Sequence, residues 1–257
     1  MSEPPKMSAT ERLWRPFLFT ILTISGAMYY GYTYKSPTQQ ERWFPTVPQS
    51  FATVASIIAV NTAVFLAWRT PLPLTWRILN RYFISVPALP YSGSILGAVF
   101  SHQTFSHLAM NSIALYIFGT TVCEQLGPGW FLALYISGGA ASSFGSLAFH
   151  VLRKNFATTS LGASGAIAAL MGTYCVVNPE KELMFVLLPF LVLKAKYFAM
   201  GMAALETTGI LCGWRVFDHV AHLGGLAWGT AFAVWLKKEM ERRRQERRKR
   251  LLSVGFR

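Results

Sequence analysis

Apolar residues in this chain gather into long runs, separated by short polar stretches that contain proline. A helix that crosses a bilayer needs about 20 mainly apolar residues, and this length predicts seven spanning helices. The expected helices cover 16–34, 51–68, 104–122, 129–150, 162–177, 197–212 and 217–236. In the first of them we expect Pro16 near the first turn and an interface belt of tyrosines at the far end.

Two further segments have apolar residues but do not fit a spanning helix. The segment 69–90 has apolar residues at helical spacing together with three arginines and four prolines, so it should lie at the membrane surface. The segment 183–193 is apolar for only 11 residues before Lys194 and Lys196. This length indicates a re-entrant or interfacial piece and not a full span.

The composition supports a membrane protein. Hydrophobic residues make up 53% of the 257 residues and charged residues only 14%, against about 25% charged in an ordinary soluble domain. Lys and Arg are absent from 82–152, where Glu124 is the only charge. We therefore expect an all-α membrane protein that forms one packed unit. Its three cysteines, Cys123, Cys175 and Cys212, have no CxxC spacing, so they should be small packing residues without a disulfide or a zinc ion.

The net charge of +13 comes largely from the end of the chain. Ten of the 24 Lys and Arg residues lie in 237–257. A basic run directly after an apolar helix is typical of contact with anionic lipid headgroups, at about 1 kcal/mol per basic residue. Nucleic-acid binding is not expected, because no fold signature for it is present. The first 16 residues lack the Arg-rich, acid-poor pattern of a transit peptide, so targeting is either internal or encoded in a presequence that precedes this chain.

Two polar residues at membrane depth suggest a catalytic pair. Ser164 lies in the sequence GASG at the start of an apolar helix, where free backbone N–H groups and the helix dipole favour an oxyanion. Gly162 and Gly165 remove bulk around its hydroxyl. His222, in the last apolar helix, could take the serine proton. The alternatives are a serine that serves close helix packing and a histidine that is hydrogen-bonded inside the bundle.

Other polar residues could complete such a site or have structural roles. His107 and Asn111 share one helix face and could stabilise an oxyanion, or could instead hydrogen-bond between helices. Gly225 and Gly229 form a GxxxG pair after His222 that could bring two helices together. Asp218 should cap the last helix. Glu206 and Glu124, at the ends of two apolar segments, are expected to be interfacial or paired. The other three histidines, His219, His102 and His150, have no acidic partner at suitable spacing for a metal site.

Three motifs in order resemble the rhomboid family of intramembrane serine proteases. Along the chain they are HxxxN at His107, GxSG at Ser164, and AHxxGxxxG in "AHLGGLAWG". The pair Trp76-Arg77 in the surface segment is also similar to one found in rhomboids. The resemblance covers about 51–236. The extra helix at 16–34 and the sequence "FDHVAHLGG" are similar to the mitochondrial, presenilin-associated branch.

The resemblance implies a six-helix core with one extra N-terminal transmembrane helix, a 1+6 arrangement. It divides the chain into an N-terminal segment (1–50), a catalytic core (51–236) and a basic tail (237–257). It implies a dyad of Ser164 and His222 without a third carboxylate. The oxyanion hole would be lined by His107, Asn111 and the N–H of Ser164, and Gly225 and Gly229 would be packing residues.

The same resemblance implies the partners and the location. Substrates would be single-pass membrane proteins that enter from the bilayer and are cut in or near their own helix, with no cofactor or metal ion. The chain would lie in the mitochondrial inner membrane. One position departs from many bacterial rhomboids, in which a tyrosine four residues after the serine stacks on the histidine. Here that residue is Ala168, so other neighbours must orient His222.

Two other function classes remain open. A rhomboid-like protein could bind or displace membrane helices without cutting them, although the presence of both Ser164 and His222 disfavours this. A channel or transporter should have further buried charges along a pathway, and this core has few.

Overall fold

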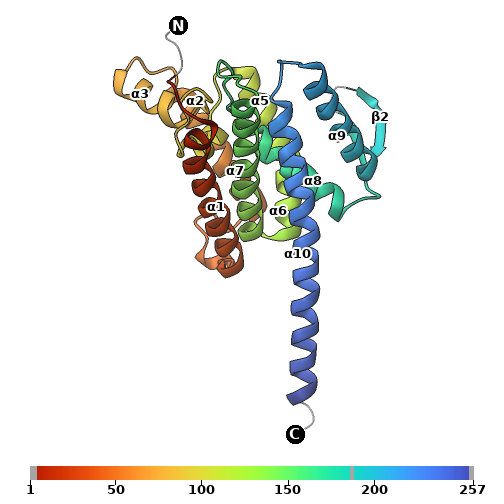
Figure 1. Cartoon of the computed structure of the whole chain (residues 1–257). Coiled ribbons are helices and arrows are strands. Elements are labelled where there is room, and N and C mark those ends of the chain that lie inside the picture. Colours follow the sequence, from red (N-terminus) through yellow and green to blue (C-terminus); the bar gives the residue numbers. More distant parts are fainter. Residues whose placement is uncertain (1–4, 186–187, 255–257) are drawn as a thin grey trace.

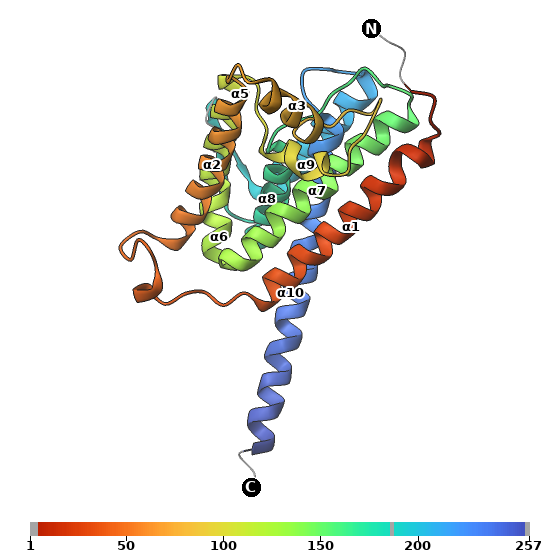
Figure 2. The same ribbon diagram turned by 90° about the vertical axis from the view of Figure 1, so that its left-hand side faces the viewer.

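Helices that run up and down the long axis of the molecule make up most of the structure (Figures 1 and 2). The computed structural model describes residues 5–185 and 188–254. The helices are α1 (Ala9–Thr33), α2 (Gln49–Ala67), α3 (Pro73–Tyr82), α4 (Ser94–Gly97), α5 (Phe105–Ala114), α6 (Thr120–Leu126), α7 (Pro128–Leu152), α8 (Ser164–Val177), α9 (Ala195–Cys212) and α10 (His219–Val254). Two short 3₁₀ turns cover Gln39–Glu41 and Ala98–Phe100.

Each of the seven expected spans corresponds to a helix or a continuous helical run. By length and hydropathy, α2 and α7 are long and apolar enough to cross a membrane, and α8 is apolar but shorter. The expected helix at 104–122 consists of α5, a π-helical turn over Leu115–Gly119, and α6. The chain therefore remains helical through 105–126.

The first helix begins earlier than expected. Pro16 lies inside α1 and not in its first turn, because the helix already starts at Ala9. Ser8 and Glu11 form a capping box there, in which each side chain binds the backbone N–H of the other residue. The buried guanidinium of Arg12 then donates hydrogen bonds to the carbonyl oxygens of Pro87 and Ala88.

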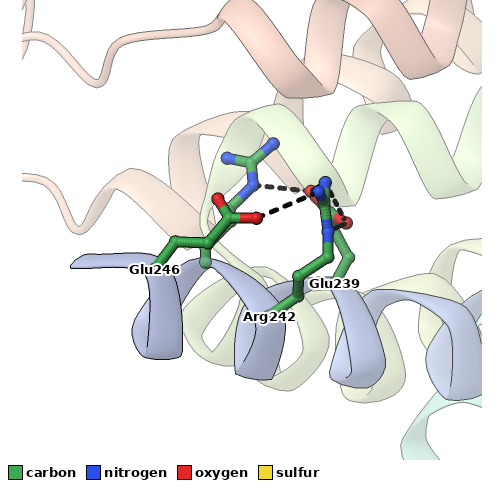
Figure 3. Close-up of polar contacts among 4 residues, drawn as sticks. Glu239, Arg242 and Glu246 are labelled. Carbon is green, nitrogen blue, oxygen red and sulfur yellow. Dashed lines mark hydrogen bonds and ion pairs between the residues drawn. The ribbon is translucent and has the colours of Figure 1, made fainter. Parts of the chain in front are cut away.

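The last helix ends later than expected. It was predicted to end near 236, but α10 continues to Val254 and extends well beyond the bundle (Figure 1). In this extension Arg242 lies between Glu239 and Glu246, with N–O distances of 2.9 and 3.2 Å (Figure 3). Such pairs at i,i+3 and i,i+4 spacing favour helix in a charged segment, so the basic tail continues the helix of the core.

A two-stranded hairpin lies between α8 and α9. Strands β1 (Glu182–Phe185) and β2 (Leu188–Lys194) pair antiparallel, with Glu182 opposite Lys194 and Met184 opposite Val192. The 183–193 segment is thus not a spanning helix, but it adds strands to a fold expected to be all-α. At its base Glu180 accepts hydrogen bonds from Lys194 and Lys196, and these two lysines lower the pKa of the carboxyl to about 2.

The segment before α5 lies at one end of the bundle, as expected for a surface element. The helix α3 has only Leu79 buried. Trp76 is exposed, donates its indole N–H to the carbonyl of Thr70 at 2.8 Å, and makes an edge contact with Trp68 at a centroid distance of 5.8 Å. The polar and aromatic residues of this segment therefore fix it against the end of α2.

The helix α8 lies at the centre of the bundle and contacts α7, α9 and α10. On the other side of α7 lies α1 (Figure 2). Cys123 and Cys175 are buried and free, as expected, but Cys212 is exposed, so the prediction of a packing role was wrong for Cys212. It is the last residue of α9, where the helix has reached the end of the bundle.

Candidate active site

Ser164 is held at the start of α8 by a loop with fixed backbone partners. Ser160 pairs with Ser85 through two backbone hydrogen bonds of 2.9 and 3.0 Å, and the N–H of Gly162 donates to the carbonyl of Ala98 at 2.8 Å. Gly162 has φ +124°, a conformation that side chains disfavour. These constraints turn the chain into the helix, and Ser164 is half-buried as its first residue.

His222 lies in the first turns of α10, which Asp218 caps as expected. One carboxylate oxygen of Asp218 accepts from the N–H of Ala221 at 3.0 Å. The other accepts from the hydroxyls of Ser146 on α7 and Ser160 in the loop, at 2.6 and 2.5 Å. Asp218 thereby joins the start of the His222 helix to the loop that leads to Ser164.

Small residues bring α8 and α10 into backbone contact. A Cβ on Gly225 would collide with the carbonyl oxygen of Gly165, and a Cβ on Gly229 would collide with that of Ala169. A Cβ on Gly165 would lie 3.5 Å from the carbonyl oxygen of Ala221. Ser164 and His222 are the sequence neighbours of Gly165 and Ala221. In the described ranges no hydrogen bond joins their side chains, so the structure brings their helices together without pairing hydroxyl and imidazole.

His107 lies beside the loop before Ser164. A Cβ on Gly162 would be only 2.7 Å from Cε1 of His107, so the imidazole packs directly on the glycine. The amide of Asn111, one turn further along α5, donates to the carbonyl of His107 at 2.9 Å. One of its two amide hydrogens is thus used within its own helix.

His102 also supports this loop, a role that the sequence did not reveal. It is fully buried, its Nε2 lies 3.5 Å from the N–H of Ala163, and its ring is 4.9 Å from that of His107. His102 lies before the start of α5. Its spacing from His107 therefore does not place the two histidines on one helix face.

The partners of Glu206 are the feature of the site that the sequence did not identify. The residue is 4% exposed, and its carboxylate contacts two imidazoles: Nδ1 of His219 at 2.5 Å and Nδ1 of His222 at 3.1 Å. Glu206 was expected to be interfacial or paired, and it is paired inside the bundle. The sequence signal was a single acidic residue in an apolar helix, which indicates a buried partner but does not identify it.

Across the described part of the chain, no three His, Cys, Asp or Glu side chains are arranged so that they could hold a metal ion. His219 is bound to Glu206, whereas His102 packs on His107. An apolar groove between α2 and α7, lined by Ile57, Val60 and Leu132 among others, does not include Ser164 or His222. The polar groups discussed above lie on α8 and on α5, α9 and α10, each of which contacts α8.

A helical bundle with a serine at the start of a central helix and a histidine on the helix packed against it defines the class of protein. The rhomboid domain model matches residues 92–239, more than half of the chain. The chain belongs to the rhomboid family, and its core is a membrane-embedded domain.

Among its relatives, it is similar to presenilin-associated rhomboid-like proteins. It is 38% identical over 198 residues to presenilin-associated rhomboid-like protein A, mitochondrial, of Danio rerio, with 73% of this chain and 50% of the relative covered. It is 35% identical over 195 residues to the Homo sapiens presenilin-associated rhomboid-like protein, mitochondrial, with 76% and 51% covered. Rhomboid protein 1, mitochondrial, of Saccharomyces cerevisiae is 33% identical over 230 residues, with 88% and 65% covered. The chain thus spans about half the length of the first two relatives.

Proposed function

We propose that this chain is an intramembrane serine endopeptidase that cleaves single-pass membrane proteins in or near their transmembrane segment. Ser164 is the nucleophile and His222 the general base and later acid. His107, Asn111 and the backbone N–H of Ser164 bind the oxyanion, and Gly162, Gly165, Gly225 and Gly229 permit the close packing on which the site depends.

The observation that supports this most strongly is the backbone contact between α8 and α10. Gly225 packs on the carbonyl of Gly165, the residue after Ser164, one turn beyond the level of His222. A nucleophile and its base must lie within about 3 Å in the reacting complex, although the distance is often longer without substrate. The contact holds the backbones next to Ser164 and His222 side by side, and this supports an approach of the two side chains in the reacting complex.

The chemistry follows from these positions. The Ser164 oxygen attacks the scissile carbonyl carbon as its proton passes to His222, and the carbonyl oxygen becomes an oxyanion. His222 then donates the proton to the leaving amine, and an acyl-enzyme on Ser164 remains. Water, deprotonated by His222, releases the second product. Because backbone in a helix is already hydrogen-bonded, the substrate segment must unwind before it can react.

The membrane arrangement is part of the same proposal. The helix α1 precedes a six-helix core formed by α2, the α5–α6 run, α7, α8, α9 and α10, in a 1+6 topology. The division into 1–50, 51–236 and 237–257 follows from it. The mitochondrial names of the relatives favour the mitochondrial inner membrane. The basic tail begins where α10 leaves the bundle. From this position its Lys and Arg side chains can reach anionic lipid headgroups.

The alternative is a catalytically silent rhomboid-like protein that binds membrane helices. The missing hydrogen bond between Ser164 and His222 is the observation that favours it. The two proposals differ in whether a covalent acyl-enzyme can form.

Cleavage of purified single-pass proteins in proteoliposomes tests the proposal. The parent should cut at least one member of a small panel, and Ser164→Ala and His222→Ala should each abolish cutting. Ser56→Ala, an exposed serine on α2, and His150→Ala, near the end of α7, serve as matched controls that keep parental activity. A panel that remains uncut by the parent, with substrates still bound, would favour the silent alternative.

A further inference from the structure

We infer that Glu206 is a positioning residue that holds the imidazole of His222 through Nδ1, so that the site is a serine–histidine–carboxylate arrangement and not a bare dyad. This inference rests on the proposed function, because it assigns a role within that reaction.

The geometry supplies the first argument. Glu206 lies on α9 and both histidines lie on α10, so the carboxylate reaches across a helix interface to bind them. Its Oε1 lies 3.1 Å from Nδ1 of His222, whose side chain is 16% exposed. Its Oε2 lies 2.5 Å from Nδ1 of His219. Each carboxylate oxygen thus has one imidazole partner.

Glu206 also determines which nitrogen of His222 carries the proton. A carboxylate only accepts hydrogen bonds, so the nitrogen facing it must be the one that carries hydrogen. With the proton on Nδ1, the lone pair of neutral His222 lies on Nε2, and this nitrogen can accept the proton of Ser164. Without Glu206 the two tautomers would compete, and one of them presents no base to the serine.

Close packing of α8 on α10 leaves no room for a large side chain at position 168. Ala168, four residues after Ser164, is 5% exposed, and its Cβ lies 3.1 Å from the point where Gly225 would carry a Cβ. A large side chain at 168 would separate α8 from α10. Phe217 lies 6.2 Å from His222 between ring centroids, but it is 63% exposed and makes no polar contact. Glu206 is thus the residue that fixes the ring.

His219 anchors the carboxylate and does not compete with His222 as the base. Its imidazole is buried against Gly209, and it makes edge contacts with Trp214 and Phe217. Its remaining nitrogen, Nε2, has no hydrogen-bond partner in the described residues. A buried carboxylate needs paired donors to offset its desolvation, and His219 provides the donor that His222 cannot supply alone.

Glu206→Gln in the full chain tests this role, because the side chain keeps its shape and loses its charge. We expect kcat on a single-pass substrate to fall about 100-fold or more while KM stays within about twofold, as for other removals of the orienting carboxylate. Glu206→Asp should recover at least a tenth of the parental kcat. Glu124→Gln, which removes the carboxylate that accepts from Ser50 at the other end of the bundle, is the matched control and should resemble the parent.

Three results would contradict the inference, and a fourth would contradict the proposed function instead. A Glu206→Gln variant with kcat within twofold of the parent would overturn it. So would an equal loss of kcat in Glu206→Gln and Glu206→Asp with a matching fall in melting temperature, because this would show a structural role. His219→Gln should keep a larger kcat than Glu206→Gln, and the reverse order would also contradict the inference. If the parent itself neither cuts nor forms an acyl-enzyme, the proposed function fails before Glu206 is tested.

Discussion

Gly162 shows at the scale of a single residue how the site depends on backbone shape. Its φ of +124° turns the chain into α8, and its missing side chain leaves room for the ring of His107. Both properties bring the ring of His107 against the loop that leads to Ser164. The sequence suggested that this glycine removes bulk near the serine, but the identity of the ring above it follows only from the fold.

Gly162→Ala should therefore damage the site through two effects. The backbone strain costs about 1–3 kcal/mol, and displacement of His107 should lower turnover about 10- to 100-fold. Turnover on a single-pass substrate and the melting temperature measure the two effects. Gly145→Ala is the matched control, because a Cβ there meets no atom within 4 Å. Unchanged turnover in Gly162→Ala would contradict the role given to this loop.

At the scale of elements, the contact between α8 and α10 decides whether Ser164 and His222 can meet. Gly225 and Gly229 each face a backbone carbonyl of α8. A flexible side chain could move away from an added Cβ, but these backbone carbonyls cannot. Nearby, Gly224 has only an ordinary contact, with Cα of Ser142 at 3.7 Å. The adjacent glycines 224 and 225 thus differ sharply in whether the structure can accommodate a side chain.

Gly225→Ala should separate the two helices, whereas Gly224→Ala should leave them in contact. Overpacking of this kind costs about 1–3 kcal/mol, so the melting temperature should fall in Gly225→Ala, together with a loss of most of the turnover. Gly224→Ala should match the parent in both measurements. Equal behaviour of the two variants would show that the α8–α10 contact does not set the site.

At the scale of the whole molecule, α1 and the end of α10 frame the core from outside. The helix α1 packs along α7, and its Arg12 binds the segment 87–88 at one end of the bundle. At the other end the guanidinium of Arg243, on α10, lies 3.8 Å from the ring centre of Tyr32 on α1. The helix α1 is therefore attached at both of its ends.

Arg12→Ala should release the start of α1. Hydrogen bonds from a charged donor contribute about 1.5–3 kcal/mol, and Arg12 is buried, so the melting temperature should fall and chymotrypsin should cut faster at the aromatic residues of α1. Arg15→Ala is the control, since Arg15 is exposed on the same helix. A melting temperature in Arg12→Ala equal to that of Arg15→Ala would show that α1 is held by its apolar face alone.

The sequence predicted the helices well and the contacts between them poorly, for physical reasons. Hydropathy and the GASG, HxxxN and GxxxG patterns are local, so they indicated the spans and the residues around Ser164. The capping box at Ser8 and the charge pairs of the tail are also local signals, and they explain helix ends that a hydropathy reading misplaced. The pairing of Glu206 with His219 and His222 depends on how α9 packs on α10, which no local spacing encodes.

The central claim is that Ser164 is a nucleophile activated by His222. Its most direct test is reaction of the purified, membrane-reconstituted chain with a fluorophosphonate, followed by mapping of the adduct by mass spectrometry. One adduct is expected, on Ser164, that is absent in folded Ser164→Ala and forms far more slowly in His222→Ala. Equal labelling of Ser164→Ala and the parent, or an adduct on another residue, would contradict it.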